Sequence, residues 1–294
     1  MKLKIYRSKN DRIISNIQND VFKGYYKYIY INGLKTYVIE KGEGIPIILI
    51  HGLSACVYTW RKIFYPLSKR FHVYAYDLRG CGCSEKLRYN YSIDSFTEDL
   101  REFMDYFKID RAILIGNSLG GEIGLNMTIK YPDRVNKLIL IDTAGYKMNL
   151  KKTNSLVKLA RISLMPQLIN IFTSKVLVAC AARFLLDNHK VINDEFINAY
   201  YCGFRTKRGV YGFVSLIRNL SYNELYFEKI KEIEKPTLII WGENDRLISS
   251  KDAYKIAKEI RNSSLVIFPN CGHGAQEEYS KKLINEINKF ILST

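Results

Sequence analysis

A serine between glycines is the first feature of this sequence that could do chemistry. The segment GNSLG, residues 116–120, directly follows an aliphatic run at 112–115. This G-x-S-x-G spacing is typical of a serine held on a sharp turn between a strand and a helix, where larger side chains at the two glycine positions would collide with their neighbours. The pattern predicts that Ser118 projects from the end of a strand as a nucleophile, beside the N–H groups of a helix N-terminus.

A serine nucleophile needs a general base, and histidine is the usual one. The chain has four histidines, and only His273 comes late enough for the chain order serine, acid, histidine that this serine pattern favours. It lies between two glycines in a loop after the last apolar run. His51 precedes the serine and sits in a turn. We interpret His72, which opens a strand, and His189, which lies in the helical insertion, as structural or exposed. His273 is therefore the predicted base.

An acid should orient that histidine by accepting its second N–H and stabilising the imidazolium that forms. Asp245 is the favoured candidate, because it follows an apolar run in WGEND, residues 241–245. Two other carboxyl groups stay open as alternatives. Glu243 is only two residues away, and Asp142 also ends a strand after the serine.

Backbone N–H groups could stabilise the oxyanion that forms when a serine attacks a carbonyl group. A second aliphatic strand ends in HGLS, residues 51–54. We predict that the N–H groups of Leu53 and Leu119 form the oxyanion hole.

These groups need a scaffold, and the chain predicts a sheet with helices on both faces. The inner strands are apolar on both sides, as in a parallel sheet that is covered twice. The first two strands of the chain are separated by Asn32–Gly33, a strong signal for an antiparallel hairpin. The expected strands are 26–31, 36–40, 46–50, 72–76, 112–115, 137–141, 237–241 and 265–268.

Helical patterns fill the remaining sequence. Apolar residues recur at steps of three and four in 92–107 and again in the C-terminal segment 279–291. Between Gly145 and Tyr222 no strand is expected, and helical patterns occupy 156–164, 168–186, 191–204 and 210–220. We predict a core formed by residues 1–145 and 222–294, with a helical cap at 146–221.

Five segments together resemble the α/β-hydrolase superfamily, in the family order and over nearly the whole chain. They are HGLS at 51–54, DLRGCGCS at 77–84, GNSLGG at 116–121, WGEND at 241–245 and GHG at 272–274. The resemblance implies an α/β-hydrolase fold: a mostly parallel eight-stranded sheet with an inserted helical cap, and no metal or organic cofactor. The chain looks most like the serine esterase and lipase-like group. Epoxide hydrolases and haloalkane dehalogenases use an aspartate where this chain has Ser118.

The leading functional hypothesis is a serine hydrolase that cleaves a small apolar or acyl-type carboxylic ester through an acyl-enzyme. The alternative enzyme is a carbon–carbon bond hydrolase of a keto acid, which an inward-facing arginine would favour. The cap arginines are Arg161, Arg183, Arg205 and Arg208. A third hypothesis is a ligand-binding protein with little turnover, but the complete set of serine, acid and histidine argues against it.

Composition adds expectations about partners and location. The net charge is +16, but the lysines are spread along the chain, which favours a solvated surface over a specific nucleic-acid site. The six cysteines lack metal-site spacing, and the first 30 residues lack a secretory signal. Polar residues interrupt the apolar region 163–186, making it a poor transmembrane segment. We expect a cytoplasmic protein with a small-molecule substrate.

Overall fold

The computed structural model describes residues 9–86, 91–145, 158, 162, 165–206, 209–218 and 228–293. It contains the predicted mostly parallel eight-stranded sheet, in the order β1-β2-β4-β3-β5-β6-β7-β8. Only β1 and β2 make antiparallel pairs, β1 with β2 and β2 with β4. The strands are β1 (Tyr26–Ile31), β2 (Leu34–Lys41), β3 (Pro46–Ile50), β4 (His72–Tyr76), β5 (Ala112–Asn117), β6 (Val135–Ile141), β7 (Thr237–Gly242) and β8 (Ser263–Phe268).

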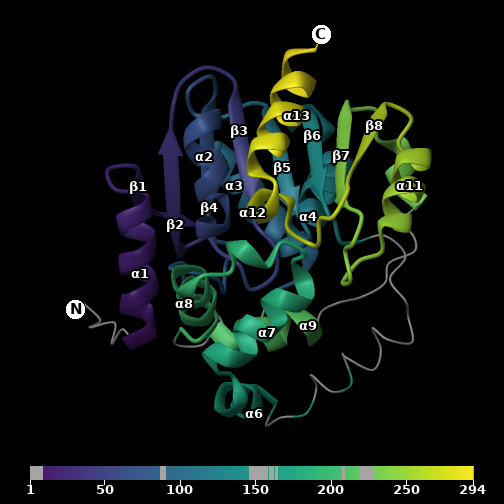
Figure 1. The fold of residues 1–294 in the computed structure, drawn as a ribbon. Helices are drawn as coiled ribbons and strands as arrows, with labels where there is room; N and C mark the ends of the chain where they lie inside the picture. Colours follow the sequence, from purple (N-terminus) through teal and green to yellow (C-terminus); the bar gives the residue numbers. More distant parts are fainter. Residues whose placement is uncertain are drawn as a thin grey trace.

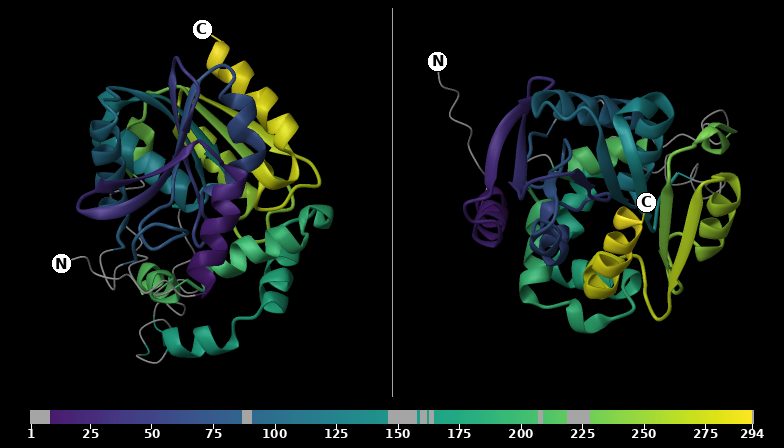
Figure 2. Two further views of the ribbon diagram at one scale, coloured as in Figure 1. Left: turned by 90° about the vertical axis from the view of Figure 1, so that its left-hand side faces the viewer. Right: turned by 90° about the horizontal axis from the view of Figure 1, so that it is seen from above.

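Helices cover both faces of this sheet. This cover is required because the inner strands are apolar on both faces. The helices of the core are α1 (Lys9–Val21), α2 (Arg61–Leu67), α3 (Ile93–Tyr106), α4 (Leu119–Lys130), α11 (Ser250–Glu259), α12 (Ala275–Glu278) and α13 (Ser280–Leu292). Alternate residues of β3 point to opposite faces: Ile48 packs with the cluster of α3, α4 and α11, and Ile47 with the cluster of α2 and α13. Viewed from above, the two helix layers lie on opposite sides of the twisted sheet (Figure 2).

Four further helices lie at the carboxyl ends of the parallel strands (Figure 1). They are α6 (Met165–Phe172), α7 (Lys175–Leu185), α8 (Asp194–Phe204) and α9 (Gly209–Arg218). Short 3₁₀ turns are η1 (Val57–Trp60), η2 (Pro132–Arg134), η3 (His189–Val191) and η4 (Ile230–Glu232). The boundaries of the predicted cap stay a prediction, because 146–157 and 219–227 lie outside the described residues, as does most of the helical pattern at 156–164.

The prediction of one continuous helix over 168–186 is wrong. The chain turns at Thr173–Ser174, and α6 and α7 meet at 94°. The Ser174 side chain accepts a hydrogen bond from the N–H of Leu177 and so caps α7, a role that serine fills well at a helix start and poorly inside one. Among the described residues no single helix is long and apolar enough to cross a membrane, and only this bent pair passes that test when taken together.

Candidate active site

Ser118 occupies a strained turn between β5 and α4. Its φ of 53° and ψ of −117° lie in a region that residues other than glycine rarely adopt. Hydrogen bonds hold the turn in place: Ser118 N–H donates to Ile141 O at 3.0 Å, and Ser118 O accepts from Gly121 N at 2.9 Å and from Ala144 N at 3.0 Å. The strain is thus maintained by the surrounding structure, as expected where a side chain must project from the sheet edge.

The glycines of the turn are required by close backbone approach. A Cβ at Gly120 would overlap the carbonyl group of Ile50, and one at Gly116 would overlap the carbonyl of Gly120. Gly203, in α8, is the contrasting case, since the nearest atom to an added Cβ would be 3.9 Å away.

We expect Gly120→Ala to destabilise the protein by about 3 kcal/mol or more, because the overlap is with rigid backbone. Urea unfolding monitored by circular dichroism measures this change. Gly203→Ala is the matched control and should unfold at or above the native midpoint, since its Cβ would make only an ordinary contact with Ile14 and alanine favours a helix. Equal stability of the two variants would contradict the close packing described for the turn.

The ends of the neighbouring strands β5 to β8 are joined by hydrogen bonds. Beyond the bond from Ser118 to the end of β6, Gly242 N–H donates to Asp142 Oδ1 at 2.8 Å, and Asn244 N–H donates to Cys271 O at 2.8 Å. The three segments that carry Ser118, Asp245 and His273 therefore lie along one edge of the sheet.

Of the three candidate acids, Asp245 is the one that contacts the predicted base. His273 Nδ1 lies 2.7 Å from Asp245 Oδ2, and both side chains are buried. The other carboxylate oxygen of Asp245 accepts from Leu247 N at 2.8 Å and from Ile248 N at 2.9 Å, which fixes the carboxylate. Glu243 is exposed. The hydrogen bond leaves Nε2 of His273 for proton transfer, although the structure records no bond from His273 to Ser118 Oγ.

Buried charges set the protonation behaviour of His273. Burial favours the neutral ring, but the hydrogen bond and charge of Asp245, with smaller contributions from Asp142 and Glu278, raise its pKa above the ordinary value of 6.5. Burial also raises the pKa of Asp142 to about 7. A general base must be neutral, so protonation of His273 at low pH removes the active form.

We expect kcat/KM to fall on the acid side with an apparent pKa above 6.5, the ordinary value for histidine. Asp142, whose own pKa is about 7, is partly ionised over this limb and stabilises the imidazolium to that extent. Asp142→Asn removes this partial charge, so it should move the acid limb modestly to lower pH while leaving the maximum rate nearly unchanged. The pH–rate profiles of native protein and variant test this. An acid limb that stays in place or moves to higher pH would contradict the assigned direction.

The turn after β3 lies directly against Ser118. A Cβ at Gly52 would be 3.2 Å from the Cβ of Ser118. The N–H groups of Leu53 and Leu119 have no hydrogen-bond acceptor among the described residues. Donors of an oxyanion hole must be unpaired in this way to bind the oxyanion. His51 braces this turn: its Nδ1 lies 2.8 Å from Gly52 O, and its Nε2 accepts from Leu78 N at 2.9 Å. Burial lowers the pKa of His51 to about 4, which suits a neutral structural ring.

Glu278 is a site residue that the sequence analysis missed. One of its carboxylate oxygens accepts from Gly272 N at 2.9 Å, next to the predicted base. The other accepts from Asp187 N at 2.8 Å and from Asn188 N at 2.6 Å, in the segment after α7. His273 N–H also donates to Leu185 O at 2.8 Å. The end of α7 is thereby bound to the histidine loop. The only sequence signal is an acidic residue in the helical turn that follows the GHG segment.

We expect Glu278→Gln to lower kcat roughly 10- to 100-fold with a much smaller change in KM, because a glutamine has one acceptor oxygen and can serve only one of the two segments. Steady-state kinetics separates the two parameters. Glu286→Gln on α13 is the control and should behave like the native protein. A native kcat for Glu278→Gln would show that the bridge does not position the histidine loop.

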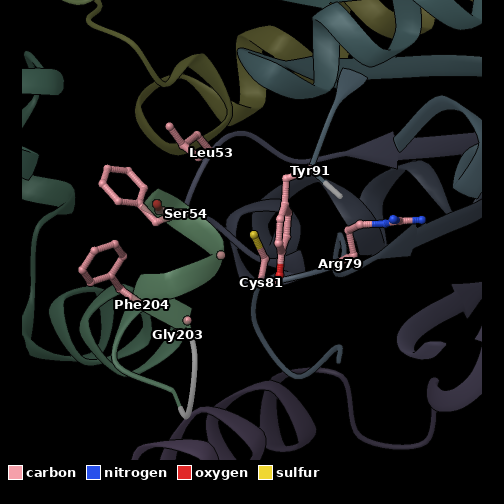
Figure 3. Close-up of a pocket in the computed structure, with 11 residues that line it drawn as sticks. Leu53, Ser54, Arg79, Cys81, Tyr91, Gly203 and Phe204 are labelled. Atoms are coloured by element: carbon pink, nitrogen blue, oxygen red, sulfur yellow. The ribbon is translucent and has the colours of Figure 1, made fainter. Parts of the chain in front are cut away.

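A pocket opens beside the turn after β3 that carries Leu53 and Ser54, between the core and the cap helices (Figure 3). The pocket is narrow: the volume that the centre of a water-sized molecule can occupy inside it is about 10 Å³. Its lining is Leu53, Ser54, Arg79, Gly80, Cys81, Tyr91, Gly203, Phe204, Gly209, Gly212 and Phe213. The Arg79 guanidinium is paired with buried Asp99 and points away from the other lining side chains in the close-up. The remaining lining consists of three aromatic residues, four glycines, Leu53, Cys81 and Ser54. This mostly apolar surface suits an uncharged apolar group.

Of the cap arginines predicted as candidates, the two that the structure describes do not direct a positive charge into the pocket. Arg183 is exposed. The Arg205 guanidinium donates to Asn170 O at 2.6 Å and to Thr173 O at 3.0 Å, so it ties α8 to the end of α6. Arg161 and Arg208 lie outside the described residues.

Comparison with known proteins gives matches over most of the chain. A family model for the alpha/beta hydrolase fold matches residues 45–279. The 2-hydroxy-6-oxo-6-(2'-aminophenyl)hexa-2,4-dienoic acid hydrolase of Metapseudomonas resinovorans is 28% identical over 90% of each chain. The 2-hydroxy-6-oxo-2,4-heptadienoate hydrolase of Pseudomonas putida is 27% identical over 90% of this chain and 95% of its own. The structure of a meta-cleavage product hydrolase from Pseudomonas fluorescens IP01 has a TM-score of 0.78 at 25% identity, covering 91% of this chain and 97% of that one.

Proposed function

Since the chain belongs to the α/β-hydrolase fold family, and hydrolases are among its relatives, we propose that it is a serine hydrolase with Ser118, Asp245 and His273 as its catalytic residues. The observation that carries this proposal is the 2.7 Å contact between His273 and Asp245, on the same sheet edge as a serine with φ of 53°. A buried imidazole paired in this way can accept a proton from a serine hydroxyl.

The mechanism follows from these positions. Ser118 Oγ attacks the substrate carbonyl while His273 accepts its proton, and Asp245 stabilises the imidazolium. The N–H groups of Leu53 and Leu119 stabilise the oxyanion. His273 then protonates the leaving group, and an acyl-enzyme on Ser118 remains. Water, activated by the same histidine, releases the acid and restores the serine.

The leading substrate is a carboxylic ester with a compact apolar acyl group. The apolar pocket beside Leu53 supports this substrate. The hydrogen bonds of Arg205 support it too, because they direct this guanidinium to carbonyl groups of the cap, whereas an arginine facing inward would favour a keto acid. The second candidate is hydrolysis of a carbon–carbon bond in a keto acid, which the relatives favour, since two of them are named as hydrolases of hydroxy-oxo-dienoic acids.

Hydrolysis of a p-nitrophenyl ester series from acetate to palmitate, beside 2-hydroxy-6-oxo-2,4-heptadienoate, separates these candidates. We expect a maximum at short acyl chains. Turnover of the dienoate alone would establish the carbon–carbon activity instead. If neither is turned over and a fluorophosphonate fails to label Ser118, the hydrolase proposal is wrong and a ligand-binding role takes its place.

We further propose that the protein is cytoplasmic and acts without a specific nucleic-acid partner. All six cysteines are free thiols in the structure, and three of them are buried, as suits a reducing compartment. The distinguishing measurement for nucleic acid is a mobility-shift assay, in which any binding should be weak and lost at high salt.

A further inference from the structure

Helices α6 and α7 expose large apolar side chains, and α7 buries small ones. On α7 the residues that face the protein are Ala179 and Ala182. A surface helix ordinarily turns its large apolar residues inward, so this arrangement is reversed. The exposed residues, which we call the α6–α7 face, are Leu168, Ile171, Phe172, Val176, Leu177 and Phe184. Ile171 and Phe172 are each 72% exposed and Val176 is 73% exposed, and such gatherings usually mark a binding surface.

This face lies on the outer side of the molecule. Figure 1 places α6 farther from the sheet than α7, α8 and α9, and the left view of Figure 2 shows α6 at the lower edge. The inner sides of the pair are occupied, since Met165 and Ile169 pack with α9 and Ala182 packs with Phe196 of α8. The apolar side chains of the α6–α7 face therefore point into solvent.

The stretch of sequence that includes α6 and α7 carries charge of one sign. From Thr143 to Leu186 the sequence contains no Asp or Glu, although 29 of the 294 residues are acidic. Lys175 and Arg183 are exposed on α7 itself. The basic residues of this stretch are Lys147, Lys151, Lys152, Lys158, Arg161, Lys175 and Arg183. The lysines are spread along the whole chain, and it is the absence of acidic residues that makes this region strongly positive.

We propose that the α6–α7 face binds the surface of an anionic phospholipid bilayer. Exposed aliphatic and aromatic side chains flanked by lysine and arginine are the composition that enters the headgroup boundary of such a bilayer. The two short helices, bent by 94°, can lie on a membrane but neither can cross it alone. A second copy of this chain fits less well, because its own positive α6–α7 face would repel the first. The proposal concerns binding and does not rest on the proposed catalysis.

Vesicle co-sedimentation of the full chain tests the proposal. We expect partitioning onto phosphatidylcholine vesicles that contain about 30% phosphatidylglycerol, and at least about tenfold weaker binding to pure phosphatidylcholine. The double variant Phe172→Ser/Val176→Ser should reduce binding at least about tenfold. Both residues are mostly exposed, so the fold should persist, which circular dichroism checks.

Tyr254→Ser is the matched control, since Tyr254 lies on α11 and is 59% exposed; it should bind vesicles like the native protein. Three outcomes would overturn the proposal. They are absence of binding to anionic vesicles, native binding by the double variant, and a native dimer that binds no vesicles and becomes monomeric in the double variant by light scattering. The last would assign the face to contact between copies of the chain.

Discussion

Ser118→Ala is expected to lower kcat/KM by roughly 10⁴-fold or more for any substrate that the native protein hydrolyses, and to abolish labelling by a fluorophosphonate. The hydroxyl is the only group removed. Alanine keeps the Cβ, so the backbone strain at φ of 53° is unchanged and the stability should remain near native. Steady-state kinetics and active-site labelling are the measurements.

Ser264→Ala provides the control for this experiment. Ser264 is exposed on the last strand of the sheet, and its loss should leave kcat/KM within about twofold of native. A Ser118→Ala protein that folds normally and retains most of its activity would exclude Ser118 as the nucleophile, and with it the acyl-enzyme.

Asp245→Asn should also cost roughly 10⁴-fold in kcat. The carboxylate accepts the Nδ1 proton of His273 at 2.7 Å, which holds the ring in the tautomer whose Nε2 can accept a proton. An asparagine can donate from its amide instead and so stabilise the wrong tautomer. It also removes the charge that holds the pKa of His273 above 6.5. The loss should therefore appear in kcat across the whole pH range.

Glu243→Gln is a matched control two residues away. Its carboxylate is exposed, and we expect activity within about twofold of native. A third variant, Asp142→Asn, distinguishes the remaining candidate. If it loses kcat at all pH values while Asp245→Asn stays active, Asp142 is the orienting acid and the assignment of Asp245 is wrong.

A structural feature could be predicted from the sequence when the residues that cause it lie close together in the chain. The eight strands follow from short apolar runs, and the hairpin follows from Asn32–Gly33, both of which take positive φ in the structure. The turn at Ser118 is also local, because the glycines that permit it lie two residues to either side. The break between α6 and α7 shows the limit of periodicity, since one apolar pattern continues through a serine that caps a new helix.

The sequence by itself determined the mostly parallel sheet, the position of Ser118 on its turn and the loop that carries His273. Only the tertiary structure decided which carboxyl group contacts that histidine, because three candidates end up near the same sheet edge and their distances depend on how β6, β7 and β8 pack. It also decided the role of Glu278, whose partner Asn188 is 90 residues away in the chain. Hydrophobic periodicity and turn chemistry act over a few residues, whereas these contacts exist only once distant segments have packed together.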